Sequence, residues 1–297
     1  MSPAIVTRFA PSPTGYLHLG HAYSVLFAAG EAAKAGGRFL VRIEDIDRGR
    51  CRREFEDAIL DDLRWLGLDW RQPCRRQSEC MDDYRAALEK LQGLGLIYPC
   101  FCTRREIRAE IARAGQAPHD AFQGQPGPIG PVYPGACRRM TAAARGGRMA
   151  AGDAFALRLD MKKAAELAGP LTWDDRDEGL IRATPEIFGD VVLARKDTPA
   201  SYHLACAVDD HIQQVTLVTR GRDLFKATHV QRLLQELLGL DRPQYRHHRM
   251  LTGDDGRRLA KRDNAVTLRA LREAGKSPDE VRKMAGYYPG GGARPGT

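Results

Sequence analysis

Two histidines stand three residues apart near the N-terminus, in the segment Arg8-Phe9-Ala10-Pro11-Ser12-Pro13-Thr14-Gly15-Tyr16-Leu17-His18-Leu19-Gly20-His21. The segment follows a run typical of a strand and opens a run typical of a helix, where free backbone N–H groups and the helix dipole favour phosphate. On the first helical turn His18 and His21 face one side and could hydrogen-bond a triphosphate. A metal site and a pair of solvated histidines are the two other interpretations.

A second candidate is a basic stretch late in the chain, Arg257-Arg258-Leu259-Ala260-Lys261-Arg262-Asp263, which follows Gly253-Asp254-Asp255-Gly256. A glycine-flanked basic loop can close over a polyphosphate, and its lysine then acts as a point charge. Taken alone, such a stretch is more often a solvated basic loop.

Three of the seven cysteines have a spacing that suits a metal ion: Cys100 and Cys102 are two apart, and Cys137 follows a stretch rich in Gly and Pro. Three thiolates and a fourth ligand complete a tetrahedral zinc site, and the metal would order a segment that lacks a core. His119 is a candidate fourth ligand. The alternative is reduced cysteines without metal. The other cysteines lack this spacing and are interpreted as buried or unpaired thiols: Cys51, Cys74, Cys80 and Cys206.

The elements that must position these groups alternate between strand and helix in the first hundred residues. The patterns predict strands at 4–10 and 38–43 and helices at 20–34, about 55–66 and 78–94. Such alternation predicts a parallel sheet with crossover helices.

From about residue 99 to 148 this pattern breaks, and the Gly/Pro-rich run at 123–131 excludes a helix interior or a central strand. Regular patterns return as strands at 191–194 and 215–219 and as helices at 202–208 and 224–238. We therefore expect an α/β domain split by an insertion. The run at 289–296 predicts a disordered tail.

The composition restricts the class of protein. The 297 residues carry a net charge of +8, with 43% hydrophobic and 28% charged residues, which suits a packed globular chain. The basic excess lies at 101–150, with 8 basic and 3 acidic residues, and at 241–297, with 13 and 7. No apolar run could cross a membrane and no signal peptide is evident, so we expect a cytoplasmic protein with anionic partners.

Together the two basic motifs resemble class I aminoacyl-tRNA synthetases. Further segments, in order, are similar to the glutamyl-tRNA synthetase catalytic core: Arg42-Ile43-Glu44-Asp45, Tyr202-His203-Leu204-Ala205, Val208-Asp209-Asp210 and Thr219-Arg220-Gly221-Arg222-Asp223-Leu224. The resemblance covers roughly 5–264. It implies a Rossmann-type doubly wound parallel sheet split by a zinc-containing insertion.

Only 36 residues follow Lys261, too few for anticodon-binding domains, and the cysteine pattern with Tyr133 resembles the short paralogues, the glutamyl-queuosine tRNA(Asp) synthetases. The resemblance favours Tyr133 over His119 as the fourth ligand of one structural Zn²⁺. That family activates L-glutamate with ATP and attaches it to queuosine in the anticodon of tRNA(Asp).

The resemblance also assigns residues. The glutamate-pocket positions are Arg8, Phe9, Ala10, Pro11, Ser12, Glu44, Tyr202 and Arg220. The positions that bind ATP, with Mg²⁺, are His18, Gly20, His21 and Lys261, of which the two histidines and the lysine are catalytic. The family's K-L-S-K loop reads Arg258-Leu259-Ala260-Lys261 here.

Simple charge chemistry agrees with this pocket, because glutamate needs arginine forks for its carboxylates and one carboxylate for its ammonium. Either Arg8 or Arg220 could take the side-chain carboxylate. Glu44 could receive the ammonium or cap the following helix, a role that suits Asp45 or Asp47 better.

The resemblance divides the chain into stretches: a first Rossmann half (1–98), the insertion (99–188), a second half (189–250), a signature-loop and helical segment (251–286) and a tail (287–297). We expect a monomer. A glutamate-activating ligase with another acceptor, a truncated glutamyl-tRNA synthetase and a catalytically dead RNA-binding paralogue are the alternatives.

Overall fold

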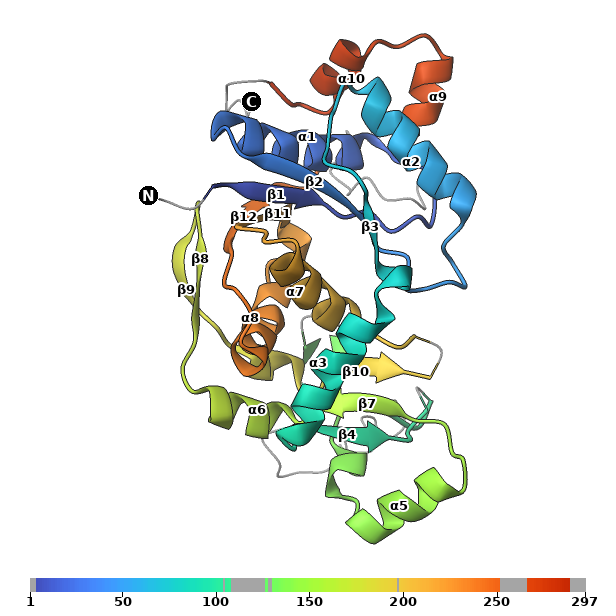
Figure 1. Cartoon of the computed structure of the whole chain (residues 1–297), viewed down its shortest axis with the longest axis vertical. Coiled ribbons are helices and arrows are strands. Elements are labelled where there is room, and N and C mark those ends of the chain that lie inside the picture. The colour runs from blue at the N-terminus through green and yellow to red at the C-terminus, as the bar shows by residue number, and fades with distance from the viewer. Residues whose placement is uncertain are drawn as a thin grey trace.

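The computed structural model describes residues 4–103, 105–107, 126–127, 130–196, 198–251 and 266–288. A parallel sheet crosses the molecule between two layers of helices (Figure 1). Its strands are β1 (Val6–Phe9), β2 (Arg38–Ile43), β3 (Arg75–Arg76), β11 (Leu217–Gly221) and β12 (Gln244–His248).

The strand order places a topological switch point at β1. β2 pairs in parallel with β1 and β3, and β11 pairs in parallel with β12. A hydrogen bond of 3.0 Å from Thr216 N to Val6 O joins the two ladders, so the order is β3-β2-β1-β11-β12. Sheets of this kind bind ligands beyond the carboxyl ends of the strands beside the switch point, here β1 and β11.

Helices cover both faces of the sheet. One layer contains α1 (Leu19–Lys34), α2 (Arg53–Trp65), α9 (Leu268–Glu273) and α10 (Pro278–Met284), and the other contains α3 (Met81–Gly93), α7 (Tyr202–Ile212) and α8 (Ala227–Leu238) (Figure 1). α2 shows why the sequence folds this way: Ile59, Leu63 and Leu66 recur at helical spacing and are completely buried.

The insertion contains an antiparallel sheet of order β10-β7-β4. Its strands are β4 (Ile97–Cys100), β7 (Ala156–Leu159) and β10 (Val192–Arg195). The same region holds α5 (Ala142–Ala150), α6 (Met161–Ala168), the hairpin β8 (Thr172–Asp175) with β9 (Gly179–Arg182), and the short pair β5 (Pro126–Gly127) with β6 (Gly130–Pro131). Four 3-10 turns complete the described elements: Gln77–Glu79, Ala136–Arg139, Pro185–Phe188 and Arg222–Leu224.

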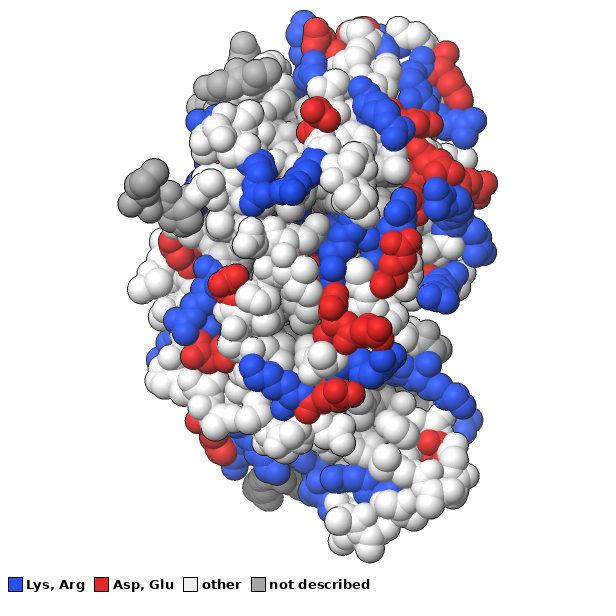
Figure 2. Space-filling model, viewed as in Figure 1, with Lys and Arg blue, Asp and Glu red and all other residues white. Residues whose placement is uncertain are grey.

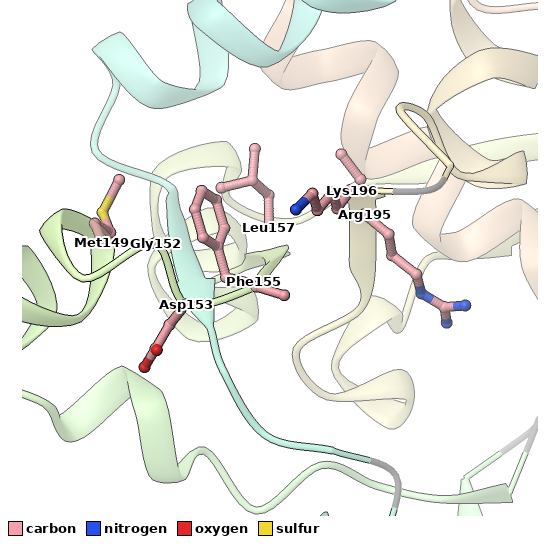
Figure 3. Close-up of a pocket in the computed structure, with 9 residues that line it drawn as sticks. Met149, Gly152, Asp153, Phe155, Leu157, Arg195 and Lys196 are labelled. Atoms are coloured by element: carbon pink, nitrogen blue, oxygen red, sulfur yellow. The ribbon is translucent and has the colours of Figure 1, made fainter.

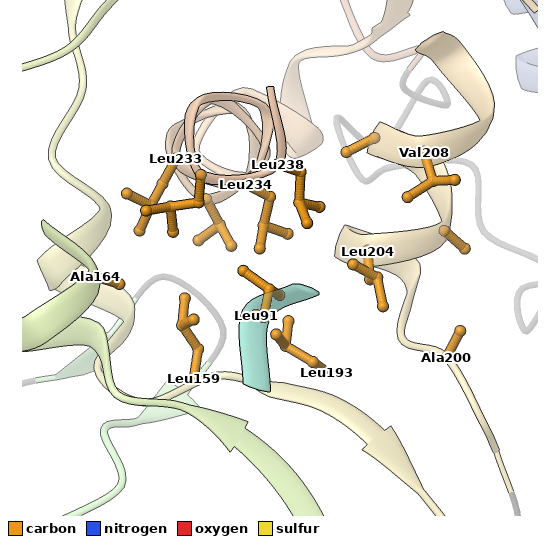
Figure 4. Packing of buried hydrophobic residues seen from close by; sticks show 14 of the residues in the cluster. Leu91, Leu159, Ala164, Leu193, Ala200, Leu204, Val208, Leu233, Leu234 and Leu238 are labelled. Carbon is orange, nitrogen blue, oxygen red and sulfur yellow. The ribbon is translucent and has the colours of Figure 1, made fainter. Parts of the chain in front are cut away.

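The insertion shares its core with the catalytic layer. β8 joins the main sheet, because Asp175 pairs with Tyr245 of β12, whereas β10 pairs with β7 of the insertion. Leu159 and Leu193 of that sheet pack beside Leu91 of α3 and against α7 and α8 (Figure 4). Elements therefore cross the boundary expected between 99–188 and 189–250, and the division into five stretches stays a prediction.

The elements expected from periodicity are present, including the parallel core sheet. The strand expected at 38–43 has those bounds, and the helix expected at 20–34 begins one residue earlier. All seven cysteines are free thiols. No helix in the described part of the chain is long and apolar enough to span a membrane. The predicted tail from 289 onward and the loop with Lys261 lie outside the described residues.

Candidate active site

His18 and His21 lie together at the start of α1, directly after the carboxyl end of β1. His18 is the N-cap residue; its Nδ1 accepts a hydrogen bond from Gly20 N (3.1 Å), and Nδ1 of His21 accepts one from His18 N (3.2 Å). The ring centroids are 3.9 Å apart. Because an accepting ring nitrogen carries no hydrogen, each neutral imidazole has its hydrogen on Nε2. Both rings are thus set to donate from Nε2, as binding of an anionic phosphate requires.

Gly20 permits this arrangement because a side chain there would collide with the histidine. A Cβ on Gly20 would lie 2.9 Å from Cε1 of His18. A segment near the C-terminus also contacts the start of α1. Thr267 forms a β-bridge with His18, and Leu268 N donates to Leu17 O (2.8 Å). Lys261 precedes this anchor by six residues but lies outside the described residues, so its predicted role remains a prediction.

Arg8 is buried and its charge is matched within the protein. Its Nε donates to Oδ1 of Asp210 (2.9 Å), its Nη1 donates to Thr219 O (3.1 Å), and its Nη2 lies 3.6 Å from Cys206 Sγ. Arg42, which is completely buried, donates to the same Asp210 oxygen (2.7 Å). Burial alone would raise the pKa of the Asp210 carboxyl, but the two guanidinium groups lower it to about 2. Asp210 is therefore a permanent counter-ion at neutral pH.

Glu44 lies at the end of β2 beside this cluster. Arg42 donates to Oε1 of Glu44 (3.1 Å), and Glu44 N donates to Pro11 O (3.0 Å). Burial raises the pKa of the Glu44 carboxyl in spite of Arg42 and Arg8. A ligand cation at this carboxylate would offset that cost. The N-cap of α2 is Arg52, and Asp45 accepts hydrogen bonds from Ser78, so the suggestion that Asp45 or Asp47 caps this helix is wrong.

Arg220 differs from Arg8 because all its side-chain partners among the described residues are neutral. It is 5% exposed and donates from Nε to His247 Nε2 (3.1 Å) and from Nη1 to Gln231 Oε1 (2.7 Å) and the Tyr202 hydroxyl (3.2 Å). Nη2 donates to Thr228. A buried guanidinium held only by neutral acceptors favours an anionic ligand.

His247 supports Arg220 from behind. Burial and the neighbouring Arg220 lower the pKa of this imidazole to about 4, so it is neutral at pH 7. Its Nε2 accepts from Arg220, and therefore its Nδ1–H donates to Asp175 Oδ2 (2.7 Å). Sequence patterns missed these supporting residues, because they lie on three separate elements, β8, β12 and α8, and each alone resembles an ordinary polar residue.

The other predicted pocket residues line the turn after β1. The Phe9 side chain is 7% exposed and packs in the core between the sheet and α1. Ala10 is half-buried, Pro11 is buried and Ser12 is exposed. Phe9 and Pro11 therefore contribute backbone to the site. The structure brings the turn, Glu44 and Arg8 together at the ends of β1 and β2.

A separate cluster of thiols occupies the tip of the insertion. The sulfur atoms of Cys100, Cys102 and Cys137 lie within 4.8 Å of one another. The Tyr133 hydroxyl is 3.4 Å from Cys100 Sγ and 3.5 Å from Cys102 Sγ. These four residues form a small buried core with Tyr98 and Phe101. His119, the rival ligand, lies outside the described residues.

The donor set fits zinc. Zinc bonds of about 2.3 Å to sulfur and 2.0 Å to oxygen place tetrahedral S···S pairs about 3.8 Å and S···O pairs about 3.5 Å apart. Cys102 Sγ and Cys137 Sγ are 3.4 Å apart, close to this geometry. Burial would raise the pKa of the Cys137 thiol, but hydrogen bonds from Phe101 N and Tyr133 lower it, which favours the thiolate that a metal binds.

The fold and site together define a class I tRNA synthetase catalytic domain. The family described as tRNA synthetases class I (E and Q), catalytic domain, matches residues 4–285. The chain belongs to this family and, within it, to the glutamyl-Q tRNA(Asp) synthetases.

Named relatives support the assignment. The chain is 49% identical over 294 residues to the glutamyl-Q tRNA(Asp) synthetase of Rhodobacter capsulatus, covering 95% of this chain and 100% of the relative. It is 42% identical to that of Symbiobacterium thermophilum, covering 95% and 86%. A crystal structure of glutamate-tRNA synthetase from Elizabethkingia anophelis superposes with a TM-score of 0.79 at 25% identity. The alignment covers 95% of this chain and 61% of that synthetase.

Proposed function

We propose that this protein activates L-glutamate with ATP, without requiring tRNA, and transfers it to queuosine in the anticodon of tRNA(Asp). An oxygen of the glutamate α-carboxylate attacks the α-phosphorus of ATP, and the bond to the β-phosphate oxygen breaks, releasing pyrophosphate. A ring hydroxyl of queuosine then attacks the acyl carbon of the mixed anhydride and AMP leaves. The chain acts as a cytoplasmic monomer.

The observation that carries the choice of amino acid is the contrast between the two buried arginines. Arg8 is neutralised by Asp210, whereas Arg220 has only neutral partners among the described residues. We assign the glutamate side-chain carboxylate to Arg220 and to the Tyr202 hydroxyl, whose hydrogen is not used for Arg220. Glu44 receives the ammonium. Glutamine would leave the Arg220 charge unmatched and is rejected.

Positioning and charge stabilisation account for the first step, with no covalent enzyme nucleophile. His18 and His21 donate from Nε2 to the ATP phosphates beside the N-terminus of α1. Lys261 supplies a further positive charge, and Mg²⁺ accompanies ATP. Gly20 lets the ATP approach the helix and lets the His18 ring fold back over it.

Zinc has a structural role in this proposal. Cys100, Cys102, Cys137 and Tyr133 would hold one Zn²⁺, which ties the end of β4 to the turn at Ala136–Arg139. No reacting group is assigned to the metal. The metal would contribute to the free energy of folding, because this tip has only a small hydrophobic core of its own.

Glutamate transfer to tRNA(Asp) prepared with and without queuosine tests the function. We expect transfer only to the queuosine-containing tRNA, and glutamate-dependent ATP–pyrophosphate exchange without any tRNA. Equal transfer to both tRNAs, or transfer only to tRNA(Glu), would contradict the proposed acceptor. Exchange without transfer to any tRNA would favour a ligase with another acceptor, and absence of exchange would favour an inactive RNA-binding paralogue.

Removal of two metal ligands tests the zinc site. We expect the Cys100→Ala, Cys102→Ala double variant to lose its zinc and to lose amide protection at the tip, while β1 and β11 stay protected. The main parallel sheet keeps its protection because Val6 of β1 and Val218 of β11 pack in the large shared core and not in the thiol cluster. Metal analysis and hydrogen exchange check this, and the control is Cys51→Ala, Cys80→Ala. Wild-type protein without zinc would refute the assignment.

A further inference from the structure

A cleft of about 360 Å³ lies in the insertion, away from the groups assigned to glutamate and ATP. Its apolar walls come from Met149 at the end of α5, Phe155 and Leu157 around the start of β7, and Ala194 of β10 (Figure 3). Phe155 is half-buried and packs edge-on against Phe101 of the thiol core. The cleft is at the small end of the range for ligand pockets and is large enough for a single base.

The charges around the cleft are positive. Arg195 and Lys196 line it, and neither forms an ion pair with a described residue. The Lys196 side chain points toward Leu157, whereas the Asp153 and Arg195 side chains point away from the apolar residues (Figure 3). Asp153 is also neutralised, because Arg148 Nε donates to its Oδ2 at 2.6 Å. An apolar cleft with a lysine at its edge that has no ion-pair partner among the described residues suits an apolar ring that carries a phosphate.

The cleft is close along the chain to the glutamate pocket. Arg195 N donates to Thr198 O (2.8 Å), and the chain then enters α7 at Tyr202, a residue of that pocket. Tyr202 is six positions after Lys196, which limits the separation of their Cα atoms to about 22 Å. A single-stranded RNA that brings one nucleotide to the glutamate pocket can therefore reach the cleft within a few nucleotides.

On the face shown in Figure 2, basic and acidic side chains are interspersed. Many of the exposed arginines elsewhere are paired within their own helices, such as Arg64 with Asp61 and Arg85 with Asp82. These pairs are weak anion sites because their charge is already matched locally.

We propose that this cleft holds one unpaired base of the RNA substrate, within a few nucleotides of the one that receives glutamate, and that Lys196 binds its phosphate. This inference rests on the proposed function. Proteins recognise single-stranded loops by splaying bases out and packing them on aromatic and apolar side chains, while cations bind the backbone. Phe155 and Met149 supply the apolar contact.

Filling the cleft tests the proposal. Ala154 is exposed and lines the cleft, so Ala154→Trp should occupy it without disturbing the core. We expect KM for queuosine-containing tRNA(Asp) to rise about 10-fold, the size of one base contact, with glutamate-dependent ATP–pyrophosphate exchange unchanged. The matched control is Ala151→Trp, an exposed neighbour that does not line the cleft. Lys196→Glu should also raise KM, and Lys162→Glu on α6 should not.

A double-mutant cycle that combines the protein variant with a modified RNA identifies which base occupies the cleft. Anticodon stem-loop RNA with queuosine is given one abasic site at each loop position in turn, and its affinity is measured for wild type and Ala154→Trp. At one position the abasic site should weaken wild-type binding about 10-fold and leave binding by the variant unchanged, because the abasic site and Ala154→Trp remove the same contact. Additive losses at every position would overturn the cleft assignment.

The two proposals can fail separately. If the wild type transfers glutamate to queuosine and Ala154→Trp leaves KM unchanged, the cleft assignment is wrong and the function stands. If the wild type neither transfers glutamate to the queuosine-containing RNA nor binds it, the proposed function fails and the cleft assignment fails with it.

Discussion

Arg220→Met is expected to reduce glutamate-dependent ATP–pyrophosphate exchange at least about 30-fold, mainly by raising KM for glutamate. Loss of one partner from a buried, hydrogen-bonded charge pair costs about 2–5 kcal/mol, which is a factor of about 30 to several thousand. In the free protein Arg220 is held by Tyr202, Gln231 and Thr228, and no described residue gives it a counter-ion in direct contact, a role that the substrate carboxylate would fill. The ratio of kcat/KM for glutamate to kcat/KM for glutamine should also fall towards one.

Two further variants separate this effect from misfolding. Arg220→Lys keeps the charge but not the fork, so its loss should be intermediate. Arg222→Met removes an exposed arginine that pairs with Glu178 and should leave exchange unchanged. If folded Arg220→Met keeps KM for glutamate within about twofold of wild type, Arg8 takes the side-chain carboxylate instead.

The groups that we propose to bind substrate lie in compact segments, so the sequence could predict which of them lie together. His18, Gly20 and His21 belong to one strand-turn-helix unit, whose local geometry follows from its residue types. The residues that support Arg220 could not be predicted from the sequence. His247 reaches Arg220 because β11 and β12 pair, and Asp175 reaches His247 because β8 lies beside β12. Nothing near these residues in the sequence indicates either pairing.

The same distinction applies to the fold. The amphipathic pattern at 224–238 predicts a helix, and α8 occupies Ala227–Leu238. The run at 191–194 predicts a strand and β10 confirms it, but its partner is β7 of the insertion. Periodicity identifies an element from its own residues, whereas strand partners depend on distant segments. The extra hairpin of β8 and β9 was missed because Gly179 and several charged residues weaken its apolar signal.

Asp210→Asn is expected to lower the free energy of unfolding by about 3–5 kcal/mol, as removal of one partner from a buried ion pair does. Arg8 and Arg42 both donate to this carboxylate and are almost inaccessible to solvent. An amide would leave two buried positive charges with less compensation. Urea unfolding measures the change, and the control is Asp61→Asn, an exposed partner of Arg64 that should alter stability by less than about 1 kcal/mol.

The pH dependence of this difference provides an independent check. Although burial alone would raise the pKa of the Asp210 carboxyl, Arg8 and Arg42 lower it to about 2, below the value of about 3.9 in an unfolded chain. A lowered pKa stabilises the fold fully above about pH 4, and the stabilisation is lost as pH falls towards 2. The difference in free energy of unfolding between wild type and Asp210→Asn should therefore become smaller from pH 5 to pH 3. Its total decrease should approach about 2–3 kcal/mol near pH 2. A gap that stays constant over this range would mean that the carboxylate charge does not hold the two arginines.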